Sequence, residues 1–125
     1  MAASSGNHGQ GVALACYRMG IPCTVVVPED AISSKVHSIK SYNPNVIYHG
    51  LYTKERLERA KNISKDKGMT FIHGFNDLRV IAGQGTIGLE ILDDLPDVDI
   101  VLVSIGGGGL VSGIATAIKE PPPST

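Results

Sequence analysis

The sequence predicts an α/β fold in which helices flank a parallel sheet. Short apolar runs rich in β-branched residues alternate with longer segments whose apolar residues recur every three or four positions. The run 100–103 has no polar alternation, a pattern typical of a strand buried on both faces of a parallel sheet. Strands that alternate with helices in this way form parallel sheets with helical crossovers.

The expected elements follow one another with short connections. Strands are expected over 24–27, 45–49, 69–73 and 100–103, and helices over 12–19, 33–42, 54–67, 79–95 and 110–118. Glycine or proline follows several of these segments, as at Gly20, Pro28, Gly50 and Gly68, and marks where they end. Residues 2–11 form a small polar loop that leads into the first helix.

Composition and charge argue against several classes of function. The chain has 125 residues, a net charge of −1 and only 5% aromatic residues, so it offers neither a basic field nor stacking surfaces for nucleic acid. No apolar run approaches the roughly 20 residues that cross a bilayer, and the first residues lack the pattern of a secretion signal. We therefore expect a cytoplasmic chain with no nucleic-acid or membrane partner.

Cysteines and histidines give no metal-binding pattern. Cys16 and Cys23 fit neither a CxxC motif nor a zinc spacing, and we expect both to be buried free thiols. The four histidines form no HxxxH or HExxH arrangement. No metal site is predicted.

Four consecutive glycines, 106–109, connect the last expected strand to the last expected helix. Backbone without Cβ atoms can approach a ligand closely, and the first N–H groups of a helix attract a phosphate. The run does not fit GxGxxG, and no Lys-Ser or Lys-Thr follows as in a P-loop. We interpret it as a phosphate cup of neither nucleotide-binding type; a plain tight turn is the alternative.

A second polar loop precedes the first expected helix. Ser4, Ser5, Asn7 and His8 lie close together there, whereas capping a helix needs only one such residue. We interpret the loop as a site for an anion or a carboxylate, with helix capping alone as the alternative.

A GxGxxG match at 83–88 lies inside an expected helix. Only three apolar residues precede it, directly after a turn, so it lacks the strand that a dinucleotide fingerprint follows. We interpret the match as accidental; a nicotinamide-dependent dehydrogenase is the function that would depend on it. Each glycine inside a helix costs about 1 kcal/mol relative to alanine, so close backbone packing is expected to offset these glycines.

Three stretches together resemble the fold-type II pyridoxal-phosphate enzymes, whose fold is that of the tryptophan synthase β subunit. They are SSGNHGQ at 4–10, IAGQGTIGLEI at 81–91 and GGGGL at 106–110. The sequence is most similar to the branch of serine/threonine dehydratases (threonine ammonia-lyases) and serine racemases. The resemblance extends from Ser4 to about Lys119, and implies a small domain over 1–76 and the start of the large domain over 77–119. The prolines of residues 120–125 cannot continue a helix, so a frayed tail is expected there.

The resemblance also implies roles for individual residues. Asn7 would hydrogen-bond the 3′ oxygen of the cofactor, pyridoxal 5′-phosphate. The residues that would hold its phosphate are Gly106, Gly107, Gly108, Gly109 and Leu110. The residues that would bind the substrate carboxylate are Ser4, Ser5, Gly6, Asn7 and His8.

Two further positions are carried over from the racemases. Ser5 matches the serine that exchanges a proton with the substrate on the side opposite the family's lysine, so it is the expected catalytic residue. Arg56 aligns with an arginine near the racemase substrate, but it lies outside any motif and a solvated helix face is the alternative.

The implied activity is that of a carbon–nitrogen lyase acting on L-serine or L-threonine. The α-proton and the β-hydroxyl leave, and a 2-oxo acid and ammonia are released, with racemisation possible through Ser5. The Schiff-base lysine lies upstream of the 4–10 loop in this family, so the chain alone is expected to show negligible turnover. A homo-oligomer is expected. A noncatalytic α/β module that binds phosphate or another anion is the alternative function.

Overall fold

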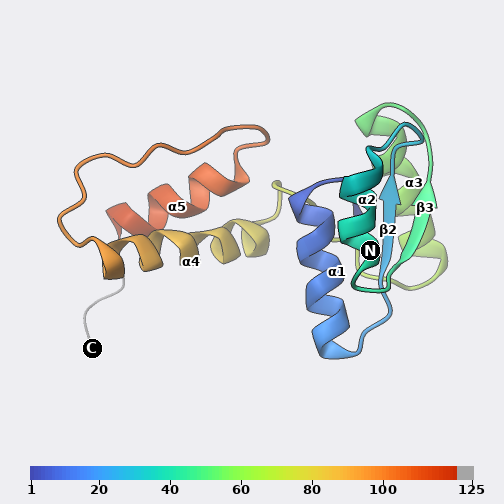
Figure 1. Ribbon diagram of the computed structural model, residues 1–125, viewed down its shortest axis with the longest axis horizontal. Helices are drawn as coiled ribbons and strands as arrows, with labels where there is room; N and C mark the ends of the chain where they lie inside the picture. The colour runs from blue at the N-terminus through green and yellow to red at the C-terminus, as the bar shows by residue number, and fades with distance from the viewer. Residues whose placement is uncertain (121–125) are drawn as a thin grey trace. The chain divides into compact units, whose positions relative to one another are not determined.

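The computed structural model describes residues 1–120, which divide into two compact units (Figure 1). The first unit comprises Met1–Ile72 and the second begins at His73. Of the predicted tail over 120–125, all but Glu120 lies outside the described residues. Each unit is described by itself.

The first unit is built on a parallel sheet of three strands. Their order is β1 (Ala2–Ala3), β2 (Thr24–Val27) and β3 (Asn45–Tyr48). Central strand β2 pairs with both neighbours, and Val25 lies opposite Ala2 on one side and Val46 on the other. The predicted parallel sheet flanked by helices is confirmed, and the strands predicted over 24–27 and 45–49 are present.

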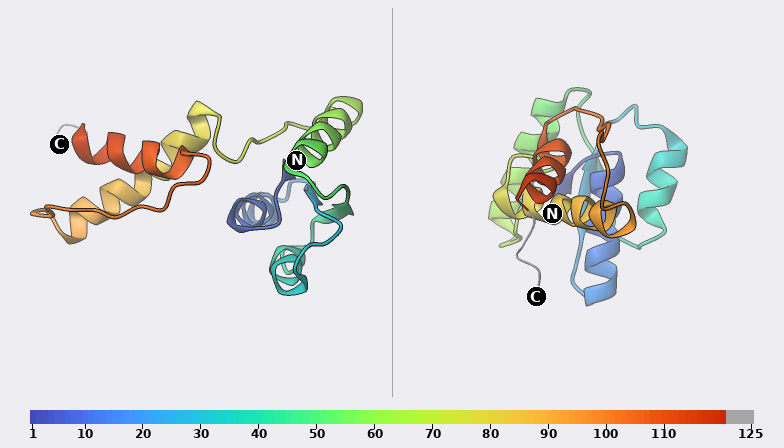
Figure 2. Two further views of the ribbon diagram at one scale, coloured as in Figure 1. Left: turned by 90° about the horizontal axis from the view of Figure 1, so that it is seen from above. Right: turned by 90° about the vertical axis from the view of Figure 1, so that its left-hand side faces the viewer.

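Three helices cover the two faces of this sheet (Figure 2, left). They are α1 (Asn7–Met19), α2 (Ser33–Lys40) and α3 (Thr53–Asp66). Val25 and Val27 point to one face and pack with residues of α1 and α2, whereas Val26 points to the other face and packs with Ala60 and Ile63 of α3. Successive residues of a strand point to opposite faces, so the uninterrupted run of valines is buried on both sides.

Helix α1 begins five residues earlier than the predicted start at residue 12. Its early start places Asn7 and His8 in the first helical turn. Gly9 makes this turn possible, because a Cβ atom there would lie 2.6 Å from the carbonyl oxygen of Ser4 and 3.1 Å from Cδ1 of Ile39. The loop and the helix therefore fold back closely on one another at Gly9.

The second unit pairs α4 (Leu78–Asp94) with α5 (Gly109–Lys119), as Figure 1 shows. A Cβ atom on Gly113 would overlap the carbonyl oxygen of Ile81 and lie 2.8 Å from the backbone nitrogen of Gly85. A Cβ atom on Gly88 would lie 2.9 Å from the carbonyl oxygen of Ile114. The backbones of the two helices thus touch, and the packing expected to offset the glycines of α4 is provided by α5.

The GxGxxG match at 83–88 lies in the interior of α4. Backbone N–H groups in a helix interior donate to carbonyl groups of the preceding turn, so they cannot hold a pyrophosphate. Two of its glycines, Gly85 and Gly88, serve the contact with α5. The match is therefore a helix-packing pattern and not a dinucleotide-binding turn.

Two predicted strands are wrong in the structure. Residues 69–73 are extended but form no strand. Two hydrogen bonds nevertheless join them to the N-terminus: the Met1 amine donates to the carbonyl oxygen of Thr70 at 3.0 Å, and the Ile72 N–H donates to the carbonyl oxygen of Met1 at 2.9 Å. Residues 100–103 are also extended, and Leu102 is 93% exposed rather than buried. A strand needs a partner strand, and the second unit contains none among its described residues.

The two cysteines are free but only half-buried, so the prediction of full burial is wrong. Burial and the neighbouring Cys16 raise the pKa of the Cys23 thiol to about 11, so it stays protonated at neutral pH. Within residues 1–120, no group of three or more histidine, cysteine or acidic side chains could hold a metal ion. In the same residues, no helix has the length and apolar character that crossing a membrane requires.

Two glycine-to-alanine changes test the contact between α4 and α5. Gly113→Ala should destabilise the helix pair by about 1–3 kcal/mol, because the new methyl group meets backbone that cannot yield. Gly83→Ala is the matched control, since nothing lies within 4 Å of its Cβ position, and it should stabilise α4 by about 1 kcal/mol. Amide hydrogen exchange across both helices measures these effects. Equal protection in the two variants would contradict the backbone contact.

Candidate functional site

The loop before α1 is held in place by backbone and side-chain bonds of Ser4. Its N–H donates to the carbonyl oxygen of Val26 at 3.0 Å, and its hydroxyl oxygen accepts the Gly6 N–H at 3.2 Å. Gly6 is the residue that precedes the helix, and no side chain caps the helix there. Capping therefore does not explain the polar residues of this loop.

The first turn of α1 presents backbone donors. The first intrahelical bond runs from the Gln10 N–H to the carbonyl oxygen of Gly6, so the preceding helical N–H groups have no carbonyl partner within the helix. Asn7 is exposed in this turn and Ser5 is half-buried just before it. This arrangement of N–H, hydroxyl and amide groups suits a carboxylate.

His8 makes a contact that the sequence did not indicate. Its Nε2 lies 3.0 Å from the carbonyl oxygen of Ile72, and it donates to that oxygen when the proton is on Nε2. Because Ile72 is the last residue of the first unit, His8 anchors the end of this unit to the first turn of α1. The ring nitrogen used here is not available to a substrate carboxylate, and Nδ1 of a neutral ring with its proton on Nε2 is an acceptor. The backbone N–H of His8 is therefore left for the predicted role.

The Arg56 side chain hydrogen-bonds groups at the start of its own helix. Its guanidinium donates to the carbonyl oxygen of Leu51 and to the hydroxyl of Thr53, both at 3.0 Å. The neighbouring Glu55 accepts the N–H groups of Tyr52 and Leu51, and these bonds hold the pKa of its carboxyl below the usual value. These bonds give Arg56 a structural task at the start of α3.

The tetraglycine turn leads directly into α5. Gly108 adopts a left-handed conformation with φ +86°, and its carbonyl oxygen accepts the first helical bond from the Ser112 N–H at 3.0 Å. The N–H groups of Gly109, Leu110 and Val111 therefore have no carbonyl partner within the helix. Backbone donors at the N-terminus of an 11-residue helix suit a phosphate.

Different structural features explain why glycine occupies most positions of this turn. The Cβ position of Gly107 is occupied by the ring of Phe75, and that of Gly109 lies 2.8 Å from Cα of Phe75. The backbone at Gly108 is in the left-handed region, which residues with a side chain rarely adopt. Gly106 is exposed and has nothing within 4 Å of its Cβ position. Neither packing nor conformation explains Gly106, whose Cβ position faces open space.

The segment before α4 shapes the surroundings of the turn. The Nδ1 atom of His73 accepts the N–H groups of Phe75 at 3.3 Å and of Asn76 at 2.9 Å. Asp77 caps α4, since its carboxylate accepts the Arg79 N–H at 2.9 Å, and it forms an ion pair with the Arg79 guanidinium at 2.8 Å. The sequence indicated only a turn here, and no pattern in it pointed to a contact between Phe75 and the glycines.

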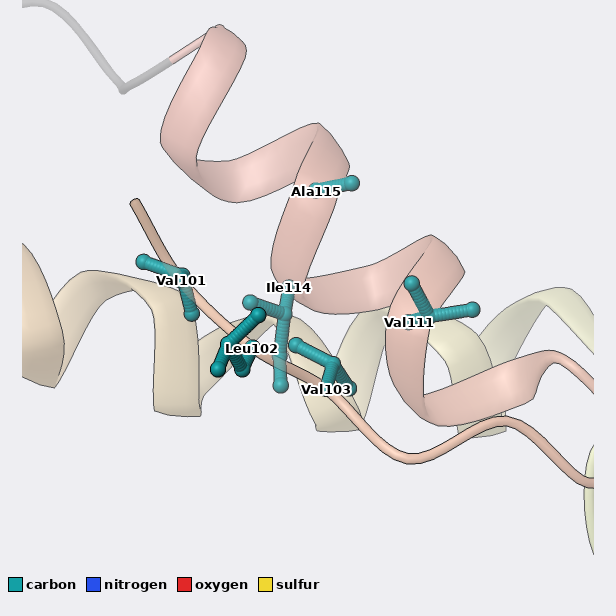
Figure 3. Close-up of a pocket in the computed structure, with 6 residues that line it drawn as sticks. All are labelled: Val101, Leu102, Val103, Val111, Ile114 and Ala115. Atoms are coloured by element: carbon teal, nitrogen blue, oxygen red, sulfur yellow. The ribbon is translucent and has the colours of Figure 1, made fainter. Parts of the chain in front are cut away.

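An apolar hollow of about 350 Å³ lies between the extended segment 101–103 and α5. In Figure 3 its side chains gather between the extended segment and the helix. They are Val101, Leu102, Val103, Val111, Ile114 and Ala115. Such a lining suits hydrocarbon groups and offers nothing to a phosphate, so it is no candidate for the predicted phosphate cup.

Comparison with known proteins identifies the class to which this arrangement belongs. The family model described as "Pyridoxal-phosphate dependent enzyme" matches residues 1–125, so the chain belongs to this family. The chain is 52% identical over 120 residues to an L-threonine ammonia-lyase of Thermotoga maritima, covering 96% of this chain and 30% of that protein. The catabolic L-threonine dehydratase TdcB of Staphylococcus aureus is 49% identical, with 99% of this chain and 36% of that protein covered.

A solved structure shows the same fold. Serine racemase of maize superposes with a TM-score of 0.91 and 41% identity, which covers 98% of this chain and 37% of the racemase. The predicted resemblance is thereby confirmed. The chain spans about a third of the length of these relatives.

The pH dependence of the second unit tests the Asp77 cap. Hydrogen bonds from the side chain and backbone of Arg79 lower the pKa of Asp77 from 3.8 to about 2. A carboxyl whose pKa is lower in the folded state contributes stability above its unfolded value, and this contribution is lost as the pH falls from about 4 toward 2. Asp77→Asn should abolish this part of the acid sensitivity of α4.

Hydrogen exchange of the α4 amides on either side of that pH range measures the effect. Glu90→Gln, which removes an exposed carboxylate from the same helix, is the control. This variant should still lose stability in α4 as the pH falls. An Asp77→Asn variant as acid-sensitive as the unmodified chain would show that Asp77 is not the group that titrates.

Proposed function

We propose that this chain is the part of a pyridoxal-phosphate-dependent lyase that binds the cofactor phosphate and the substrate carboxylate. The substrates would be L-threonine or L-serine, which would lose the amino group as ammonia and become 2-oxo acids. Family membership and the names of the relatives, L-threonine ammonia-lyase and L-threonine dehydratase, support this proposal. The likeness to a serine racemase supports racemisation as a second activity of the same site.

The tetraglycine turn is the observation that carries the proposal. Its backbone donors, together with the open space at Gly106, fit a phosphate group, which Gly106, Gly107, Gly108, Gly109 and Leu110 would bind. The exposed amide of Asn7 would hydrogen-bond the 3′ oxygen of the cofactor ring. When bound, pyridoxal phosphate withdraws electrons from the α-carbon of an amino acid and so makes its proton acidic.

The loop before α1 would orient the amino acid. The N–H groups of the first turn, including that of His8, and the side chains of Ser4, Ser5 and Asn7 would bind its carboxylate, together with Gly6. Ser4 would contribute mainly by holding the loop, because its hydroxyl already accepts the Gly6 N–H. The half-buried hydroxyl of Ser5 would give a proton to the α-carbon or take one from it, which is the step that racemisation requires.

We also propose a cytoplasmic homo-oligomer without nucleic-acid or membrane partners. The net charge of −1 supports the absence of a polyanion partner. Large apolar side chains on the surface of the second unit, including Leu78 at 82% exposure and Leu102 at 93%, support association with further protein.

Titration with two ligands tests the proposal against a noncatalytic anion-binding module. Pyridoxal 5′-phosphate should bind more tightly than inorganic phosphate if Asn7 hydrogen-bonds the ring as proposed, and Asn7→Ala should then remove this difference. Equal affinities that Asn7→Ala leaves unchanged would favour the anion-binding module. Borohydride reduction followed by mass spectrometry should yield no adduct, since binding by this chain is expected to be noncovalent. A pyridoxyl group on one defined lysine would contradict that expectation.

The glycine turn allows a finer test. Gly106→Ala should keep the stability of the second unit, because its methyl group meets open space, but should weaken pyridoxal 5′-phosphate binding about tenfold by filling the approach to the donors. Gly107→Ala is the comparison, since its methyl group would collide with Phe75 and should lower stability as well. Calorimetric titration and hydrogen exchange of α5 measure the two effects. Unchanged affinity in Gly106→Ala would place the phosphate elsewhere.

A further inference from the structure

Phe75 makes an unusual contact for a large apolar side chain. Its ring carbons occupy the place that a side chain on Gly107 would need, and its backbone lies 2.8–3.0 Å from the Cβ position of Gly109. Alternate glycines of the tetraglycine turn thus rest on one residue. The three atoms nearest to the Cβ position of Gly107, and the three nearest to that of Gly109, all belong to Phe75.

This contact does not belong to a hydrophobic core. Phe75 is 42% exposed and is part of neither buried cluster, both of which lie in the first unit. A half-exposed ring outside any buried cluster removes little apolar surface from water, so burial is a weak reason for an aromatic residue here. A flat ring, in contrast, gives a glycine peptide a surface along which it can lie closely.

His73 holds this ring in its orientation. The two rings meet edge to face, with centroids 4.6 Å apart and planes at 88°. The Nδ1 atom of the same histidine accepts the Phe75 N–H at 3.3 Å and the Asn76 N–H at 2.9 Å, which fixes the backbone that carries the ring. Contacts with His73 therefore hold both the ring and the backbone of Phe75.

We propose that Phe75 is a positioning residue of the phosphate site, and that its ring sets the path of the tetraglycine turn and thereby the direction of the turn's N–H groups. This inference rests on the proposed function, because it assigns a second residue to the same phosphate cup. Phe75 acts through the glycines and needs no contact of its own with the phosphate. Hydrogen bonds weaken steeply when a donor points away from its acceptor, so a small change in the path of the turn lowers affinity.

A leucine substitution separates shape from hydrophobicity. Phe75→Leu keeps an apolar side chain but removes the flat ring, and it should weaken binding of pyridoxal 5′-phosphate and of inorganic phosphate about tenfold. Phe75→Tyr keeps the ring and should bind both within about twofold of the unmodified chain. In the unmodified chain one α-hydrogen of Gly107 points at the ring, so nuclear magnetic resonance should show an unusual ring-current shift there that Phe75→Leu abolishes.

Phe71→Leu is the matched control. It makes the same substitution at the other phenylalanine, which packs against the second core of the first unit, and should change the stability of that unit without changing phosphate affinity. Binding that is weakened equally by Phe71→Leu and Phe75→Leu would overturn the inference, because a general loss of stability would then explain both. Full affinity in Phe75→Leu, with the unmodified chain binding normally, would overturn it and leave the proposed function intact. Absence of phosphate binding by the unmodified chain would overturn both.

Discussion

The contact of α4 with α5 is the constraint on which the second unit depends. Glycines on both helices let the backbones meet, and Gly113 fits between Ile81 and Gly85. Helices that pack this closely have little freedom to slide, because interiors at this density do not deform continuously. The position of α5 in turn fixes the direction of its first N–H groups. The packing of two helices thereby determines where the proposed phosphate donors point.

Local patterns in the sequence predicted most of the regular structure. All five helices were predicted, because apolar residues at three- and four-residue intervals mark one face of a helix wherever it packs. The valine run of β2 and the strand at 45–48 were predicted for a similar reason. Failure came where a structure depends on a partner: β1 has only two residues and no pattern of its own, and 100–103 has the composition of a buried strand without a strand beside it.

In the candidate site, too, local patterns were predicted from the sequence and contacts between distant residues were not. The two polar or glycine-rich loops that precede helices were identified from the sequence, and the family resemblance that they carry is confirmed. The sequence did not reveal that Phe75 supports the glycine turn, because this contact joins residues more than thirty positions apart. Nor did it reveal that His8 binds the carbonyl group of Ile72. Contacts between distant residues leave no periodic signal.

The exposed run 100–105 has a consequence for how the chain behaves when it is made. These six residues, IVLVSI, combine high β-propensity with no charge and no proline, which is the composition of segments that stack into amyloid-like sheets. Ile100, Leu102 and Ile105 are all more than 70% exposed. The carboxylates of Asp97 and Asp99 stand directly before the run, and repulsion between such charges on adjacent copies opposes stacking. Asp97 and Asp99 thus have the placement of the charged gatekeeper residues that flank apolar strands.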